Sequence, residues 1–232
     1  MSKLMTRRSV IGTAAGAVAA CTTSGAFASS RSMQFDVIRG NDLIGTHRLD
    51  FMLRGDALVV NVEISLVVEV AWIPVFRYEH ANTEVWRDGR LVQLDSRTHD
   101  DGNDHVVHAE VDGDGLVIEG DHGRIVAEPD ILTTSYWHPE TPTRDRLLDT
   151  QKGRIVEVVH VPSGIDRMAV ARDSLEAQRY EASGDLDLTI WYSLQGIWCG
   201  LRFDARGEQV NYQPVIFPDP DAWQQITSAI GA

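Results

Sequence analysis

Residues 58–70 read LVVNVEISLVVEV, and this stretch decides the fold class. Every second position from Leu58 to Val70 is apolar, so seven apolar side chains fall on one face of an extended chain. The opposite face includes the polar residues Asn61 and Glu63. A sheet that covers a core on one side and meets water on the other has this pattern. The stretch therefore predicts a long antiparallel strand and not a helix.

The same alternation recurs along most of the chain after residue 30. Short spacers rich in glycine, asparagine and aspartate separate the alternating segments, for example Gly40-Asn41-Asp42 and Gln195-Gly196, and such spacers join neighbouring strands as hairpins. The other predicted strands are residues 34–39, 45–53, 75–86, 91–98, 105–111, 116–118, 154–161, 167–171, 178–182, 186–194, 197–204 and 210–215.

A sheet of about a dozen hairpin-connected strands has to curl, close or split to protect its edges. The sequence therefore predicts an all-β fold, an antiparallel meander that forms a barrel or a strongly curved half-barrel. One short C-terminal helix is expected. There Asp219 can act as the N-cap and Pro220 suits the first turn. Trp223, Ile226 and Ile230 follow at helical spacing, so they form an apolar stripe.

The N-terminal residues have the layout of an export signal. Arg7 and Arg8 precede a run of small and apolar residues that is shorter than the roughly 20 residues needed to cross a bilayer. We expect a twin-arginine signal peptide over 1–28, cleaved after Ala28, and a single β domain over 29–232 that works in the periplasm. The alternative is a lipoprotein signal that ends before Cys21, which would anchor the protein to the envelope through a lipid. Neither case predicts a transmembrane span.

Charge and cysteine content restrict the classes of partner. The formal net charge of −13 at pH 7 argues against nucleic acid as a partner. Cys21 and Cys199 are the two cysteines, and removal or lipidation of Cys21 leaves no disulfide. The sequence has no Cys-x-x-Cys, no His-Glu-x-x-His and no glycine-rich phosphate loop, so we expect no metal and no cofactor. The oligomeric state stays open.

One predicted strand, residues 75–86, has no purely apolar face. Tyr78 and His80 alternate onto the same side as Glu84 and Trp86, which combines aromatic surface with groups that form hydrogen bonds and titrate. A ligand cavity is typically lined in this way. An edge strand with ordinary aromatic packing is the alternative.

The longest irregular segment runs from residue 128 to residue 151 and contains Ser135, Tyr136, Trp137 and His138. Three prolines in it interrupt regular strand pairing, and its aromatic content is too high for a disordered linker. We expect an ordered lid or plug whose aromatic residues reach the mouth of the sheet. The alternative is that these side chains only pack.

Several short motifs are spread along the chain: Phe35-Asp36-Val37, Ile44-Gly45-Thr46-His47, Arg77-Tyr78-Glu79-His80, Glu84-Val85-Trp86, Thr134-Ser135-Tyr136-Trp137 and Trp191-Tyr192. Taken together, they resemble the motifs of an uncharacterised family of exported bacterial β-sheet proteins. The resemblance covers nearly all of the sequence after the signal, and it implies export and the β fold but no reaction.

Three functions fit these observations. The first is a binding protein that holds a small apolar or amphipathic ligand. The second is a cofactor-independent hydrolase, lyase or isomerase that uses His80, Glu84 or His138 as general acid or base on a small substrate. The third is an envelope scaffold that meets another protein. The residues expected to bind the ligand are Tyr78, Trp86, Arg97, Ser135, Tyr136 and Trp137.

Overall fold

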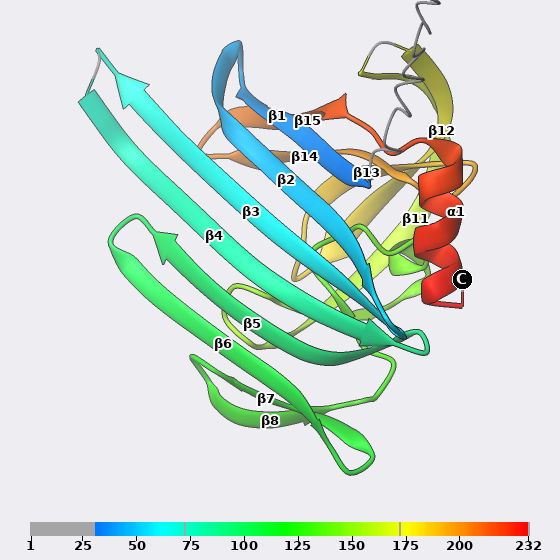
Figure 1. Ribbon diagram of the computed structural model, residues 1–232. Helices are drawn as coiled ribbons and strands as arrows, with labels where there is room; N and C mark the ends of the chain where they lie inside the picture. Colours follow the sequence, from blue (N-terminus) through cyan, green and yellow to red (C-terminus); the bar gives the residue numbers. More distant parts are fainter. Residues whose placement is uncertain (1–30, 72, 172, 232) are drawn as a thin grey trace, which may run out of the picture.

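The computed structural model describes residues 31–71, 73–171 and 173–231, which form one strongly curved sheet of 15 strands and one α-helix (Figure 1). The strand order is β8-β7-β6-β5-β4-β3-β2-β1-β15-β14-β13-β12-β11-β10-β9. Only the β9–β10 pair within these residues is parallel. Because β8 and β9 stand at opposite ends of the order, the sheet is not closed. The prediction of an all-β meander with a strongly curved, half-barrel form is confirmed.

The strands of the first half of the chain run as one continuous meander. They are β1 (Ser32–Arg39), β2 (Asp42–Arg54), β3 (Ala57–Val70), β4 (Ile73–Arg87), β5 (Arg90–Asp100), β6 (Asn103–Asp112), β7 (Gly115–Gly120) and β8 (Gly123–Ala127).

The second half returns on the other side of β1. Its elements are β9 (Leu132–Thr133), a 3-10 turn (Thr141–Thr143), β10 (Arg146–Leu148), β11 (Ile155–Val170), β12 (Asp173–Gly184), β13 (Leu188–Ser193), β14 (Trp198–Ala205), β15 (Glu208–Ile216) and the helix α1 (Pro220–Ala229).

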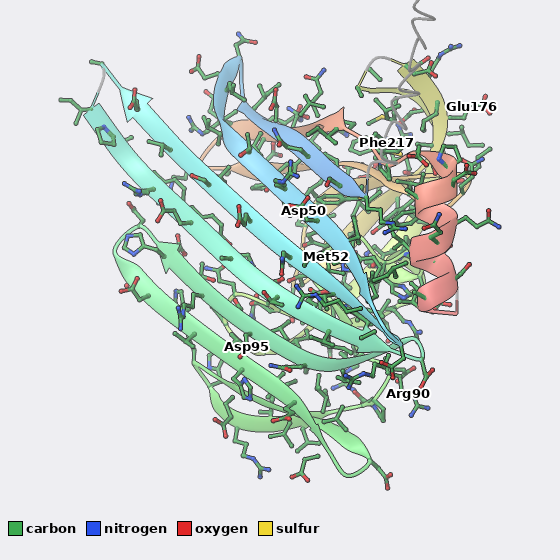
Figure 2. All side chains as sticks on the ribbon, in the orientation of Figure 1. Asp50, Met52, Arg90, Asp95, Glu176 and Phe217 are labelled. Carbon is green, nitrogen blue, oxygen red and sulfur yellow. The ribbon has the colours of Figure 1, made fainter. Side chains whose placement is uncertain are left out.

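The core lies on the concave side of the sheet. Leu58, Val60 and Val62 of β3 are buried there, as the alternation of residues 58–70 predicts. The convex side is more polar: the side chains of Asp50 on β2 and Asp95 on β5 are 38% and 53% exposed (Figure 2). The sheet therefore buries one face and hydrates the other, as antiparallel sheets commonly do.

The segment between β8 and β11 crosses the concave side. It contributes the short strands β9 and β10, which pair with each other, and β10 also pairs with β11. Trp137 is fully buried, and Ser135 is 3% exposed. The segment is ordered, as expected, but Trp137 and His138 pack in the interior and not at the mouth of the sheet. The strands β8, β9 and β10 were not predicted.

Strand β11 is a single strand where the sequence pattern indicated two, over 154–161 and 167–171. A register shift between Pro162 and Gly164 lets β11 continue past the proline. The end of the β11–β12 hairpin covers a small separate core of Ala177, Trp191 and Cys199. Proline therefore produced a bulge in this strand and did not end it.

The C-terminal helix has the predicted signals. The side chain of Asp219 accepts a hydrogen bond from the backbone N–H of Ala222 at 2.8 Å, and Trp223 and Ile226 are buried. The helix lies against β2 and β3 (Figure 1). The predictions for the signal peptide, its cleavage and Cys21 fall outside the described residues.

Candidate ligand-binding cavity

A cavity of about 700 Å³ lies on the concave side of the sheet. Residues of β2, β3 and β4 line one wall, and residues of β13, β14 and β15 line the other. Thr134, Ser135 and Tyr136, which follow β9, form what we call the floor. Pockets of roughly 300 to 1,000 Å³ hold drug-sized ligands, so the space is large enough for one.

The walls of the cavity are mainly apolar. Curvature brings strands that are distant in the chain opposite each other, so aliphatic and aromatic side chains converge from both halves of the sheet. The apolar wall residues are Ile44, Val62, Ile64, Leu66, Val68, Val75, Phe76, Leu186, Leu188, Leu201, Phe203, Ala205 and Val210.

His80 borders the cavity from β4 and is 5% exposed. Its Nδ1 lies 2.8 Å from Oγ1 of Thr98, and its Nε2 lies 3.4 Å from Oγ1 of Thr150. Burial lowers the pKa of His80 to about 4, although the charge of Asp149 opposes this shift. His80 is therefore neutral at pH 7, and its second hydrogen bond is long enough for a ligand to replace.

His47 of β2 borders the same cavity and is 3% exposed. Neither ring nitrogen has a hydrogen-bond partner among the described residues. The ring lies among aromatic rings, with centroid distances of 5.3 Å to Trp198 and 5.6 Å to Tyr212. Burial, with a smaller contribution from the nearby His80, lowers the pKa of His47 to about 3. A buried imidazole without any partner is unusual, because buried polar groups are normally paired.

Three tyrosines complete the polar lining: Tyr78, Tyr136 and Tyr212. Their hydroxyl groups make no hydrogen bond to another described residue, and none is among the sealed polar atoms of the interior. Burial raises the pKa of all three phenols above the ordinary value. All three hydroxyls are thus uncharged at neutral pH and reach open space.

Tyr136 has an unfavourable backbone conformation. Its φ is 61°, in the left-handed region that bulky residues rarely adopt. Its carbonyl oxygen accepts a 2.6 Å hydrogen bond from the hydroxyl of Tyr192 on β13, which helps to hold this conformation. Strained residues of this kind concentrate at functional sites, so the placement of the Tyr136 ring against the cavity supports a role for the floor.

Charged residues border the cavity where strands end and in the loops. Asp149 accepts from the backbone N–H of Gln151 at 2.9 Å and from Nε of Arg154 at 3.3 Å. Basic and acidic groups are equal in number along the lining, so it has no strong net charge. They are Arg39, Lys152, Arg154 and Arg206, and Asp100, Asp149, Asp185 and Asp187.

Glu84 is fully buried beneath the floor and is not part of the cavity lining. Its Oε1 accepts hydrogen bonds from the hydroxyls of Thr133 at 2.9 Å and Ser135 at 2.6 Å. Its Oε2 accepts from the indole nitrogens of Trp86 at 3.0 Å and Trp137 at 2.9 Å. Four donors form hydrogen bonds with this carboxyl group. Glu84 therefore fixes the segment that follows β8 onto β4.

His138 lies apart from the cavity lining and is 5% exposed. Its Nδ1 accepts a 3.2 Å hydrogen bond from the backbone N–H of Glu140, and its ring packs 5.6 Å from Trp86 and 5.3 Å from Trp137. Burial lowers the pKa of His138 to about 4. The interior therefore separates His138 from His80, and these residues do not converge on one open site.

The residues predicted for the site fall into three places. Tyr78, His80, Ser135 and Tyr136 border the cavity. Glu84, Trp86, Trp137 and His138 are buried outside its lining. Arg97 is exposed and lies on the convex face, because it pairs with Ala81 and not with His80.

His47 and Tyr212 border the cavity but were not predicted from the sequence as site residues, although His47 lies in one of the motifs that carry the family resemblance. Both alternate with inward-facing apolar neighbours, Leu49 and Val210, so the period-two pattern places them correctly. The two residues lie close together because β1 pairs with both β2 and β15. The sequence does not reveal this pairing.

Other site types find no support within the described part of the chain. No group of three or more histidine, cysteine, aspartate or glutamate side chains there could hold a metal ion. No helix among residues 31–231 that the structure describes is long and apolar enough to cross a membrane.

Comparison with known proteins places the chain in a family without an assigned activity. Among curated proteins, none matches this sequence. The structure is similar to the crystal structure of a beta-barrel-like protein of domain of unknown function DUF1849 from Brucella abortus, with a TM-score of 0.55 and 11% sequence identity. The similarity covers 79% of this chain and 94% of that chain, and at this identity it shows the fold alone.

The sequence itself gives the family. Residues 35–215, which make up most of the chain, match the family described as Domain of unknown function (DUF6134). The resemblance to an uncharacterised β-sheet family is thereby confirmed, while export stays a prediction. The chain belongs to the DUF6134 family.

Proposed function

We propose that this protein is an extracytoplasmic binding protein that holds one small apolar or amphipathic ligand in the concave cavity. The observation that carries the proposal is a cavity of about 700 Å³ with apolar walls and buried polar groups that lack partners. Apolar walls favour the transfer of apolar ligand surface out of water. The few polar groups among them would orient the ligand.

The proposed location rests on the N-terminal sequence. Arg7, Arg8 and the short apolar run after them have the features of a twin-arginine signal, which would deliver the folded chain to the periplasm. Cleavage after Ala28 would release a soluble protein, whereas lipidation of Cys21 would hold it at the envelope. The cavity serves a ligand in either case, because its lining comes from residue 39 onward.

The cofactor-independent enzyme is the weaker alternative. Of the three predicted acid-base residues only His80 borders the cavity, and Glu84 is occupied by four donors. General acid-base catalysis needs a titratable group within hydrogen-bond reach of the substrate, and neither Glu84 nor His138 borders the cavity to act together with His80. An envelope scaffold would not require a cavity, so the cavity also favours binding over that alternative.

Titration with the uncharged fluorescent probe N-phenyl-1-naphthylamine tests the proposal. We expect saturable binding of one probe per chain, with the fluorescence increase that an apolar site produces. The double variant Ile64→Trp/Leu66→Trp fills the wall from β3 and should weaken binding by about tenfold.

Val67→Trp is the matched control, because Val67 lies on the same strand but pairs with Arg77 on the opposite face. It should change the affinity by less than about twofold. Absence of probe binding by the wild-type protein, or equal effects of the two tryptophan changes, would contradict the proposed function.

A further inference from the structure

We propose that the ligand carries an uncharged oxygen, in a hydroxyl or ketone group on an otherwise apolar body, and that this oxygen is bound by His47 beside the cavity floor. The inference deepens the proposed function and rests on it. It concerns which chemical group the cavity recognises and which end of the ligand enters first.

His47 has a buried imidazole ring whose two nitrogens lack hydrogen-bond partners among the described residues. A neutral imidazole has one N–H donor and one nitrogen acceptor. Each unpaired buried polar group typically destabilises a fold by about 1 to 3 kcal/mol. Phenylalanine or leucine would pack among Phe35, Trp198 and Tyr212 without this loss. A ligand that pairs with the ring gives the imidazole a function that packing does not.

The ring can present a nitrogen to the cavity. His47 is part of the lining, and a half-turn about its terminal side-chain torsion exchanges the positions of ring nitrogen and ring carbon. No hydrogen bond holds the ring in the orientation that the structure shows, in which both nitrogens are sealed from the open space. After the half-turn, the edge that lines the cavity would offer a donor or an acceptor to a bound molecule, without movement of β2.

The groups near His47 select an uncharged partner. His80, Tyr136 and Tyr212 line the same space, and burial keeps all of these side chains neutral at pH 7. Asp149 is the charged group that acts on His80, and it is already bonded to Arg154 and to the backbone of Gln151. A carboxylate or an ammonium group beside His47 would therefore lose its hydration without gaining an opposite charge.

A hydroxyl or ketone oxygen matches this setting. A hydroxyl both donates and accepts, so it suits either tautomer of His47, and a ketone accepts from the N–H. The apolar remainder of such a ligand would extend along Ile64 and Leu66 toward Phe76, where β4 begins. The polar end thus enters first, and the apolar body follows along the walls.

Displacement of N-phenyl-1-naphthylamine by four matched compounds tests the inference at pH 7.5. Naphthalene, 2-naphthol, 2-acetonaphthone and 2-naphthoate share one apolar body and differ in the group attached to it. We expect 2-naphthol and 2-acetonaphthone to bind about tenfold more tightly than naphthalene and more tightly than 2-naphthoate. In His47→Phe this preference over naphthalene should fall below about threefold while the probe still binds.

A second readout reports on the imidazole itself. The side-chain ¹⁵N resonances of His47 should shift when 2-naphthol binds and should shift much less with naphthalene. His47→Gln keeps a donor and an acceptor, so it should retain most of the preference that His47→Phe loses.

The two proposals fail differently. If the probe does not bind to the wild-type protein, the proposed function is wrong. If the probe binds but naphthalene equals 2-naphthol, if 2-naphthoate binds best, or if His47→Phe keeps the preference, the inference about the ligand oxygen is overturned alone. If His47→Phe does not fold, the wild-type order of affinities and the ¹⁵N shifts decide the question.

Discussion

The indole nitrogen of Trp137 donates a 2.9 Å hydrogen bond to Oε2 of Glu84, and this contact joins the segment after β9 to the C-terminal part of β4. Glu84 also holds Ser135, which lines the cavity floor. The shape of the cavity therefore depends on a carboxyl group that the ligand does not touch. Glu84 acts as a positioning residue for the floor.

Two replacements of Glu84 should lower the free energy of unfolding by different amounts. Glu84→Leu leaves the indole donors of Trp86 and Trp137 unpaired in the interior, so we expect the free energy of unfolding to fall by about 3 to 5 kcal/mol. Glu84→Gln keeps an acceptor oxygen, and the hydroxyls of Thr133 and Ser135 can turn to accept from its amide. Its loss should be about 1 to 2 kcal/mol in urea denaturation. Equal losses for the two variants would contradict the hydrogen-bond assignment.

Stability should fall as the pH is lowered from 8 to 5. Burial lowers the pKa of His47 to about 3 and those of His80 and His138 to about 4, from an ordinary value of 6.5. Below pH 6.5 the unfolded chain takes up protons on these side chains and the folded chain does not, so acid favours unfolding. At pH 5 each histidine should contribute a loss of about 2 kcal/mol.

Denaturant titrations at pH 8 and pH 5 measure this loss. His108 has a raised pKa because Asp95 bonds to it, and its effect has the opposite sign, but its side chain is 46% exposed and its contribution should be small. Burial also lowers the pKa of the half-buried His160, so His47→Phe should remove about a quarter to a third of the pH dependence. A free energy of unfolding that stays constant between the two pH values would show that the three imidazoles are not held neutral by burial.

His47→Phe should stabilise the protein while it impairs recognition. The variant removes two unpaired buried nitrogens and keeps a planar ring among Phe35, Trp198 and Tyr212. We expect the free energy of unfolding at pH 7.5 to rise by about 1 to 2 kcal/mol. A residue that serves binding at the expense of stability behaves in this way. A clear loss of stability would indicate that the imidazole is bonded within the native fold.

Gly45 permits the close approach of β2 and β3 near the cavity. A Cβ atom on Gly45 would lie 1.9 Å from the carbonyl oxygen of Ser65 on β3. Gly45→Ala should therefore lower the free energy of unfolding by about 3 kcal/mol. Gly55→Ala is the control: it has a φ of +64° but no atom within 4 Å of the added Cβ, so we expect about 1 kcal/mol. Similar melting temperatures for both variants would rule out the steric argument.

Arg97→Ala should leave ligand binding unchanged. Its guanidinium group lies on the convex face of β5, opposite the face that carries Ser96 and Thr98 into the interior. We expect the affinity for N-phenyl-1-naphthylamine to stay within about twofold of wild type. The stability should change by less than about 0.5 kcal/mol, as for most surface substitutions. A strong loss of affinity would mean that the ligand binds on the convex side.

Much of the fold follows from local pattern. The alternation in residues 58–70 fixed the buried face of β3, and the inward direction of Tyr78, His80, Glu84 and Trp86 on β4 follows from the same period. Side-chain direction in a strand is a local property, so one strand is sufficient to read it. The N-cap at Asp219 is local in the same sense.

Relations between strands could not be read in this way. The pairing of β4 with β5 shifts between Val85 and Trp86, so Leu91 and Leu94 both face inward although they are three residues apart. Because of this register, Arg97 lies opposite Ala81 and away from His80. Three of the four donors to Glu84 likewise come from residues about fifty positions later in the chain. The register between strands and the position of the segment after β8 therefore determine which of the predicted residues border the cavity.

Methyl-resolved NMR of the isotope-labelled protein tests most directly whether the concave cavity binds the ligand. Addition of N-phenyl-1-naphthylamine or 2-naphthol should shift the methyl signals of Ile64, Leu66 and Leu201 and give cross-relaxation between them and the aromatic protons of the compound. The methyl signals of Val126 and Val159, which are exposed outside the cavity, should not move. Shifts confined to Val126, Val159 and other exposed methyls, with Ile64, Leu66 and Leu201 unchanged, would contradict the account.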